Sequence, residues 1–291
     1  MSESSIPMCE AAQADVAAPG FQLPPLACDT HAHVFGPSSQ YPYTPNRTYT
    51  PPDALLEQYI DLHNTLGIQR GVLVQPSVYG TDNRAMLDAM AQLGDRYRAV
   101  AVVPADISMA ELRQLHQQGV RGIRVNLLFK GGINFDDMKV LADKIRQLDW
   151  HLQVLVDVSD FDNLFEVLMK LEVPIVVDHM GHMPAQLGTG HEGFSTLLRL
   201  LDTGQCWVKL SGSYRITEQD STPYTNVQPV ARRLIDHRLD RMVWGSDWPH
   251  PCFNRPMPND GALLDMLAQW APEETERERI LVTNPAKLYD F

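Results

Sequence analysis

The pentapeptide PIVVD, at residues 174–178, is apolar at four of its five positions and ends in a carboxylate. A strand exposed on one face would alternate apolar and polar side chains, whereas a nearly continuous apolar run indicates a strand buried on both faces. Such strands are typical of parallel sheets covered by helices. This short stretch therefore predicts an α/β fold built on a parallel sheet.

Similar runs recur along the chain and alternate with longer segments of helical periodicity. The expected strands are 26–33, 71–75, 99–103, 122–126, 153–158, 175–179, 206–210 and 241–245. The expected helices include 54–66, 85–93, 138–148 and 161–171, and Ser108 with Glu111 predicts a capping box at the start of another. This alternation of about eight βα units predicts a single-domain (β/α)8 TIM barrel.

Length and charge narrow the class of protein. The chain has 291 residues, 44% of them hydrophobic, which is enough for one large core. Its formal net charge of −12 argues against a nucleic-acid or anionic-membrane partner, because those surfaces are anionic too. A small anionic substrate remains compatible through a local basic pocket, and so does a homo-oligomer.

The ends and the cysteines indicate the compartment. Residues 1–24 carry acids where a secretory signal needs a basic start and an apolar core, so we expect a flexible tail before a barrel spanning 25–291. The four cysteines are scattered and form no disulfide framework, which favours a cytoplasmic protein.

Polar residues stand where the expected strands end, and a barrel of this kind carries its active site at those ends. Side chains alternate along a strand, so His31 and His33 point to one face and can meet at one metal ion or one carbonyl oxygen. A polar strand end without function is the plainer alternative. His179 and Asp247, at the ends of two other strands, favour a shared site.

One connection is unusually long. Residues 34–53 are rich in Pro, Tyr and Ser, and they leave the first strand at the same end as the histidine pair. Length alone fits either a structureless insertion or a binding loop. The position next to His31 and His33 favours a binding loop or lid.

Seven stretches carry a resemblance to a known family: DTHAHVFGP, RTYTP, QPSVYGTDNRAM, GVRGIRVNL, VVDHMGH, WVKLSGSYR and VWGSDWPHP. With them the chain resembles the amidohydrolase superfamily, in the branch of lactone hydrolases typified by 2-pyrone-4,6-dicarboxylate lactonase. The resemblance implies that Asp247 is the general base and that His31, His33 and His179 polarise the lactone carbonyl. These roles suit the chemistry, since a carboxylate can take a proton from attacking water while fixed imidazoles stabilise the oxyanion.

The resemblance also implies a set of residues that bind the substrate's acid groups: Tyr49, Ser77, Arg124, Lys130, His182, Arg215 and His250. Arg124 lies within an otherwise apolar strand, where an unpaired charge is costly, and a guanidinium binds both carboxylate oxygens. A structural salt bridge inside the barrel is the alternative interpretation of Arg124.

Three positions depart from the family pattern. Leu155 stands where the pyrone lactonase has tyrosine and metal-binding relatives have histidine, while His182 and Lys130 replace arginines. Leucine cannot bind a metal, so we expect no obligatory cofactor. If one divalent ion such as zinc is bound, its ligands are His31, His33, His179 and Asp247.

Together these observations predict a cytoplasmic lactonase that opens a carboxylated lactone or pyrone, 2-pyrone-4,6-dicarboxylate-like, in aromatic-compound catabolism. A sulfomuconolactone or sugar-lactone hydrolase is the first alternative. A metal-dependent non-oxidative decarboxylase of the same superfamily is the second, and a non-catalytic acid- or sugar-binding barrel is the third.

Overall fold

A computed structural model describes residues 6–128 and 135–291. Within these ranges one eight-stranded sheet runs in the order of the sequence, and every neighbouring pair is parallel. The strands are β1 (Cys28–Ala32), β2 (Arg70–Val74), β3 (Tyr97–Ala101), β4 (Val120–Asn126), β5 (His151–Leu155), β6 (Ile175–Val177), β7 (Cys206–Leu210) and β8 (Met242–Trp244). The predicted (β/α)8 barrel is confirmed.

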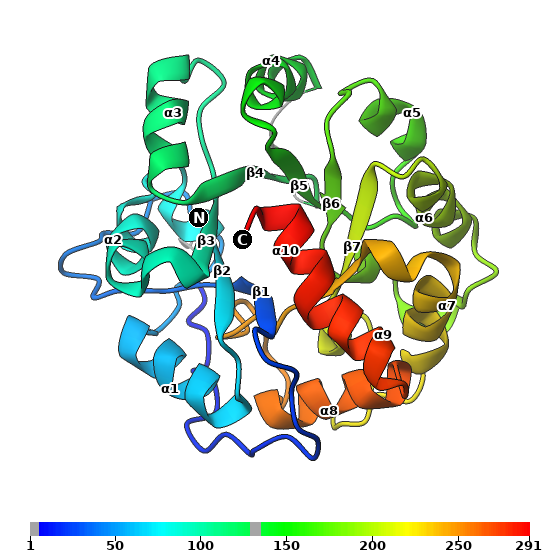
Figure 1. Cartoon of the computed structure of the whole chain (residues 1–291). Helices are drawn as coiled ribbons and strands as arrows, with labels where there is room; N and C mark the ends of the chain where they lie inside the picture. The colour runs from blue at the N-terminus through cyan, green and yellow to red at the C-terminus, as the bar shows by residue number, and fades with distance from the viewer. Residues whose placement is uncertain (1–5, 129–134) are drawn as a thin grey trace, which may run out of the picture.

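Helices surround the sheet (Figure 1). They are α1 (Leu56–Leu66), α2 (Arg84–Leu93), α3 (Met109–Gln117), α4 (Phe135–Ile145), α5 (Leu164–Met169), α6 (Glu192–Asp202), α7 (Gln228–Arg238), α8 (Asp260–Trp270), α9 (Glu274–Glu278) and α10 (Asn284–Tyr289). The predicted capping box opens α3, where the Ser108 side chain accepts from the backbone of Glu111. The part of the chain described contains no helix long and apolar enough to cross a membrane.

The barrel closes between its last and first strands. The backbone N–H of Asp247 donates to the carbonyl of His31 at 2.7 Å, and the N–H of His33 donates to the carbonyl of Trp248 at 2.8 Å. Buried Asp29 adds a clamp, because its Oδ1 accepts from the backbone N–H groups of both His31 and Ser246. Closure therefore fixes His31, His33 and Asp247 next to one another.

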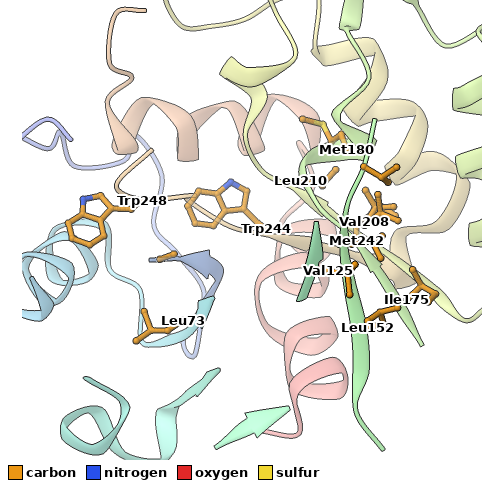
Figure 2. Close-up of a cluster of buried hydrophobic side chains, with 14 of the residues drawn as sticks. Leu73, Val125, Leu152, Ile175, Met180, Val208, Leu210, Met242, Trp244 and Trp248 are labelled. Atoms are coloured by element: carbon orange, nitrogen blue, oxygen red, sulfur yellow. The ribbon is translucent and has the colours of Figure 1, made fainter. Parts of the chain in front are cut away.

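Alternation along the strands divides the core into two layers. One set of side chains packs between the barrel wall and the helices; Figure 2 shows Leu152, Ile175 and Val208, from three consecutive strands, close together in this layer. The other set fills the barrel interior, where Val72, Val100 and other small apolar side chains pack against Tyr289. In Figure 1 α10 lies across this end of the barrel, opposite the carboxyl ends of the strands, and we call it the lower end.

Element bounds differ from the expected ones by a few residues. The fifth strand begins at His151, two residues before the expected start, and ends at Leu155 rather than at 158. It starts early because His151 pairs with Gly122 of β4, a contact that no local pattern shows.

The segment expected to be a flexible tail lies against the barrel where it is described. The backbone N–H of Gly20 donates to Asp265 on α8 at 2.6 Å, and that of Ala17 donates to Asn259. Cys9 pairs with Thr50 through the backbone. The mobility of this arm stays a prediction, and residues 1–5 lie outside the described ranges.

Candidate active site

A cavity of about 470 Å³ opens at the carboxyl ends of the strands. It is lined by His33, Tyr49, Ser77, Arg124, Leu128, Leu155, His179, His182, Arg215, Asp247, Pro251, Cys252, Phe253, Asn254 and Arg255. Most residues predicted for the site therefore face one space. Tyr49 comes from the long connection 34–53, so that connection contributes to the site as a binding loop would.

Asp247 lies at the centre of the predicted catalytic group. Its Oδ1 is 3.7 Å from Nε2 of His31 and 3.8 Å from Nε2 of His33, while its Oδ2 is 3.9 Å from Nε2 of His179. All four side chains are buried. The separations exceed a hydrogen bond, so the three rings converge on the carboxylate without being bonded to it.

The two oxygens of Asp247 have different surroundings. Oδ2 accepts from the Tyr214 hydroxyl at 2.6 Å and from Nε of Arg215 at 2.5 Å. Although burial disfavours the charged form, the Arg215 guanidinium helps hold the pKa of Asp247 well below its usual range. The carboxylate is therefore ionised at neutral pH, with Oδ1 left facing the histidines.

His33 has an assigned tautomer. Its Nδ1 is 2.7 Å from the carbonyl oxygen of Val74, which can only accept, so Nδ1 carries the hydrogen. Burial holds the pKa of His33 well below its usual value, and the ring is neutral. Its Nε2 therefore presents a lone pair to the cavity, which suits a metal ligand or an acceptor and not a donor to an oxyanion.

His31 is held from below by two buried charges. Its Nδ1 is 3.2 Å from Oδ1 of Asp178 and also 3.2 Å from Nζ of Lys209. Lys209 already donates to the carbonyl of Thr30 and to Gln153, both at 2.8 Å. Lysine can only donate, so its bond to Nδ1 leaves the hydrogen of a neutral His31 on Nε2, whereas a hydrogen bond to Asp178 would put that hydrogen on Nδ1. In the described part of the chain Oδ1 of Asp178 accepts no hydrogen bond, which favours the first arrangement.

His179 differs from the other two histidines. Its Nδ1 is 2.9 Å from the hydroxyl of Ser211, which can donate or accept. If Ser211 donates, Nε2 carries the hydrogen and can stabilise a developing oxyanion. The backbone φ of 51° at His179 and 64° at Asp247 places both residues in the left-handed region, a strain that is commonly stored at functional sites.

Five of the seven predicted substrate-binding residues line the cavity, Lys130 is not described, and His250 is turned away from the cavity. Tyr49, Ser77, Arg124, Arg215 and His182 line the cavity. Arg124 also pairs with Asp178 at 3.3 Å, so the ligand-binding and salt-bridge interpretations of Arg124 both fit its position. Lys130 lies outside the described residues.

His250 is placed differently from the prediction. It is fully buried behind Asp247 and is absent from the cavity lining, and its ring nitrogens face Tyr214 and Asp260. The geometry does not favour substrate contact by His250, because both nitrogens are occupied away from the cavity.

Sequence reasoning missed two residues and left two unassigned. Tyr214 bonds Asp247 and follows the seventh strand beside Arg215, in a motif used only for the arginine. Arg255 lines the cavity from a loop that carries no periodic pattern. Asp178 and Lys209 stood on strand ends in the sequence, but their pairing beneath His31 depends on barrel closure.

The donor set fits a single divalent ion. His31, His33 and Asp247 offer ligand atoms within 4.8 Å of one another, and His31, Asp178 and His179 form a second such group. Among the described residues, Nε2 of His31 is buried without a hydrogen-bond partner. The Nε2 lone pair of His33 faces the Asp247 carboxylate, which is unfavourable unless a cation or a proton lies between them. Leu155 lines the cavity as predicted, but the other donors converge without it.

Comparison with known proteins agrees with this geometry. Residues 28–291 match the family model described as amidohydrolase. The 4-sulfomuconolactone hydrolase of Hydrogenophaga intermedia is 38% identical over 99% of this chain and 98% of its own. The 2-pyrone-4,6-dicarboxylate hydrolase of Comamonas testosteroni is 39% identical over 93% of this chain and 92% of its own.

A solved structure gives the same fold. The "probable 2-pyrone-4,6-dicarboxylic acid hydrolase" of Acinetobacter baumannii, crystallised with citric acid, superimposes with a TM-score of 0.78 at 30% identity. The superposition covers 91% of this chain and all of that one. The buried histidine and aspartate group, the barrel that holds it and these matches agree, and the chain belongs to the amidohydrolase family.

Proposed function

We propose that the protein is a lactonase that opens a planar, carboxylated lactone or pyrone of aromatic-compound catabolism. The observation that carries the proposal is the position of Asp247 beside a cavity lined by arginines. It is an ionised carboxylate whose Oδ1 faces the imidazoles of His31 and His33 and whose Oδ2 lies near that of His179. The relatives named as lactone hydrolases support it, because they match nearly the whole chain.

Asp247 would act on the attacking water. Water is a weak nucleophile at neutral pH, and a carboxylate within hydrogen-bond reach can take its proton as the oxygen attacks the ester carbon. Oδ1 is the oxygen for this step, since Oδ2 is occupied by Tyr214 and Arg215. When a substrate acid group binds Arg215, Asp247 loses part of its ion pair and becomes a stronger base.

The carbonyl oxygen of the lactone needs a hydrogen-bond donor as negative charge develops on it. His179 is the neutral histidine that can donate from Nε2, with Ser211 bonded behind it. His33 cannot donate in this way, because its hydrogen is committed to Val74. The expected polarising role therefore differs between the histidines.

A divalent ion such as zinc would be held by His31, His33 and Asp247, whose ligand atoms lie within 4.8 Å of one another. His179 would be a fourth ligand only if Ser211 accepts from Nδ1, because Nε2 cannot bind the ion and donate to the oxyanion at once. It would supply Lewis-acid polarisation of the carbonyl and a lowered pKa for bound water. Because His33 presents a lone pair and His31 and Asp247 converge on the same point, we expect one ion per chain and a loss of ring opening after chelation. Full activity in protein shown by elemental analysis to be free of metal would restore the metal-independent mechanism expected from Leu155.

The acid groups of the substrate would bind to the arginine and hydroxyl side chains that line the cavity beside Asp247. Arg124 and Arg215 offer guanidinium donors, and Tyr49 with Ser77 offers hydroxyls. Leu155 and His182 also line this space, at positions where the pyrone lactonase pattern has tyrosine and arginine. Weaker anchoring there favours a second candidate substrate, a sulfonated muconolactone with a different distribution of acid groups.

The test compares the two substrates directly. Ring opening of 2-pyrone-4,6-dicarboxylate and of 4-sulfomuconolactone is followed by ultraviolet absorbance with the same purified enzyme. We expect at least one to be hydrolysed, and the ratio of kcat/KM values assigns the substrate. Carbon dioxide release without ring opening would support the decarboxylase alternative instead. Cytoplasmic location and a homo-oligomeric state remain predictions for fractionation and light scattering.

A further inference from the structure

A chain of buried polar side chains leads away from the cavity behind Asp247. The Tyr214 hydroxyl donates to Oδ2 of Asp247 at 2.6 Å, Nδ1 of His250 is 3.0 Å from the same hydroxyl, and Nε2 of His250 is hydrogen-bonded to Oδ2 of Asp260 at 3.3 Å. Tyr214, His250 and Asp260 are fully buried, and Asp247 is 1% exposed. None of the three residues behind Asp247 lines the cavity, so substrate contact does not explain them.

The members of this chain come from three separate parts of the fold. Tyr214 lies in the turn after β7, His250 in the connection after β8, and Asp260 is the first residue of α8. A carboxylate in the first turn of a helix is favoured by the helix dipole, which gives the chain a fixed end. The ring of Tyr214 is fixed as well, by T-shaped packing on His250 and on Phe253.

The direction of each hydrogen bond follows from what each group can do. A carboxylate only accepts, so Tyr214 spends its one hydrogen on Asp247. Its oxygen then accepts from Nδ1 of His250. One hydrogen between Nε2 of His250 and the carboxyl group of Asp260 completes the series and fixes the ring.

The consequence for Asp247 is a division between its two oxygens. Oδ2 is held by Tyr214 and by Arg215, whereas Oδ1 points to His31 and His33 without a hydrogen bond. Arg215 lines the cavity and is expected to bind substrate, so its hold on Asp247 varies with occupancy. Tyr214 provides the hold that does not depend on the substrate.

We propose that Tyr214, His250 and Asp260 are positioning residues that hold the Asp247 carboxylate by Oδ2 and keep Oδ1 directed at the reacting centre. The inference rests on the proposed lactonase function for its activity readout. In this arrangement each residue orients the next one: Asp260 orients His250, His250 orients the Tyr214 hydroxyl, and that hydroxyl orients the carboxylate of Asp247.

The first experiment removes one oxygen atom. Tyr214→Phe keeps the ring and its packing and deletes the donor to Asp247. We expect kcat for the lactone to fall about 10- to 100-fold, with KM within about threefold, because a hydrogen bond to a charged group is lost and the substrate contacts are kept. Tyr59→Phe is the matched control, because its buried hydroxyl has no hydrogen-bond partner among the described residues, and we expect its kcat to change less than about twofold.

A second experiment tests the order of action. Asp260→Asn alone is expected to lower kcat, but in the Tyr214→Phe background it should add almost nothing, since the hydroxyl that it orients is gone. Independent structural damage would instead multiply the two losses. Unchanged kcat in Tyr214→Phe, or multiplied losses in the double variant, would overturn the proposal.

Failure of the proposed function is recognisable separately. A wild-type enzyme that opens neither lactone would refute the lactonase assignment, and the same variants are then compared by Zn²⁺ affinity in competition with a chromogenic chelator. Loss of a residue that orients a metal ligand typically weakens metal binding 10- to 100-fold, and we expect about tenfold here. Equal affinity in wild type and Tyr214→Phe would contradict the positioning role.

Discussion

The two ends of the barrel interior are built from the same strands but from opposite kinds of side chain. At the lower end Cys28, Val72 and Val100 pack with Tyr289 in an apolar cluster, and the buried ring of His151 packs edge-on against Tyr289. At the upper end the same strands present His33, Arg124 and other polar groups to a cavity. The difference shows that stability comes from one end of each strand and chemistry from the other.

A charged layer separates these two ends. Lys209, Asp178 and Gln153 are fully buried and bonded to one another beneath His31. Burial lowers the pKa of Lys209 to about 8, against the opposing effect of Asp178. This layer is buried like the core, and it also contacts His31 of the site.

The largest effect on folding is expected at this layer. In Lys209→Met the hydrogen bonds from Nζ to the carbonyl of Thr30 and to Gln153 are lost, and Asp178 loses one of its cationic partners. We expect the free energy of unfolding to fall by about 3–5 kcal/mol. Urea denaturation measures the loss. The exposed Lys139→Met is the control and should stay within about 0.5 kcal/mol. If the free energy of unfolding of Lys209→Met changed as little as that of Lys139→Met, the charged layer would not contribute to the stability of the core.

The next effect sharpens the polar end. Arg124→Met is expected to raise KM for the carboxylated lactone about 10- to 100-fold relative to a neutral lactone, because a charge-assisted contact to the acid group is lost. Comparing the KM values of the two lactones for the same variant cancels any loss of stability that follows from breaking the ion pair between Arg124 and Asp178. Equal changes in KM would leave Arg124 with its structural role alone.

The smallest effect concerns the lower end and its dependence on pH. His151 is buried, and within residues 6–128 and 135–291 neither of its ring nitrogens has a hydrogen-bond partner. Burial lowers the pKa of His151 to about 3. The folded pKa lies below the ordinary value near 6.5, so its contribution is fully present above about pH 6.5 and is lost as pH falls toward 3. Between pH 7 and pH 5 this loss is about 2 kcal/mol. His151→Leu should flatten that slope in urea melts, and an unchanged slope would contradict the assignment.

The fold was largely predictable from the sequence because its signals are local. A run such as 174–178 shows burial on both faces, and the capping box at Ser108 needs only three further residues. The histidine pair followed from alternation along one strand. Boundaries shifted where pairing decides them, as at His151, whose start depends on the neighbouring Gly122.

The site was predictable in its residues and less so in their roles. Asp247, His31, His33 and His179 do converge. The hydrogen position on His33, however, depends on the carbonyl of Val74 on the neighbouring strand, 41 residues away in the sequence. His250 lies near the site in sequence and turns its ring away from the cavity, because Tyr214 and Asp260 bind it from other elements. Such contacts exist only after the barrel closes.

The central claim is that Asp247 activates water, and Asp247→Asn tests it most directly. Asparagine keeps the size of the side chain but cannot take a proton at neutral pH, so kcat for ring opening should fall by about 10³-fold or more while the ligand still binds. Substrate binding measured by calorimetry and ring opening measured by ultraviolet absorbance give both quantities on one preparation. A variant that binds the lactone and opens it at a rate near wild type would contradict the account.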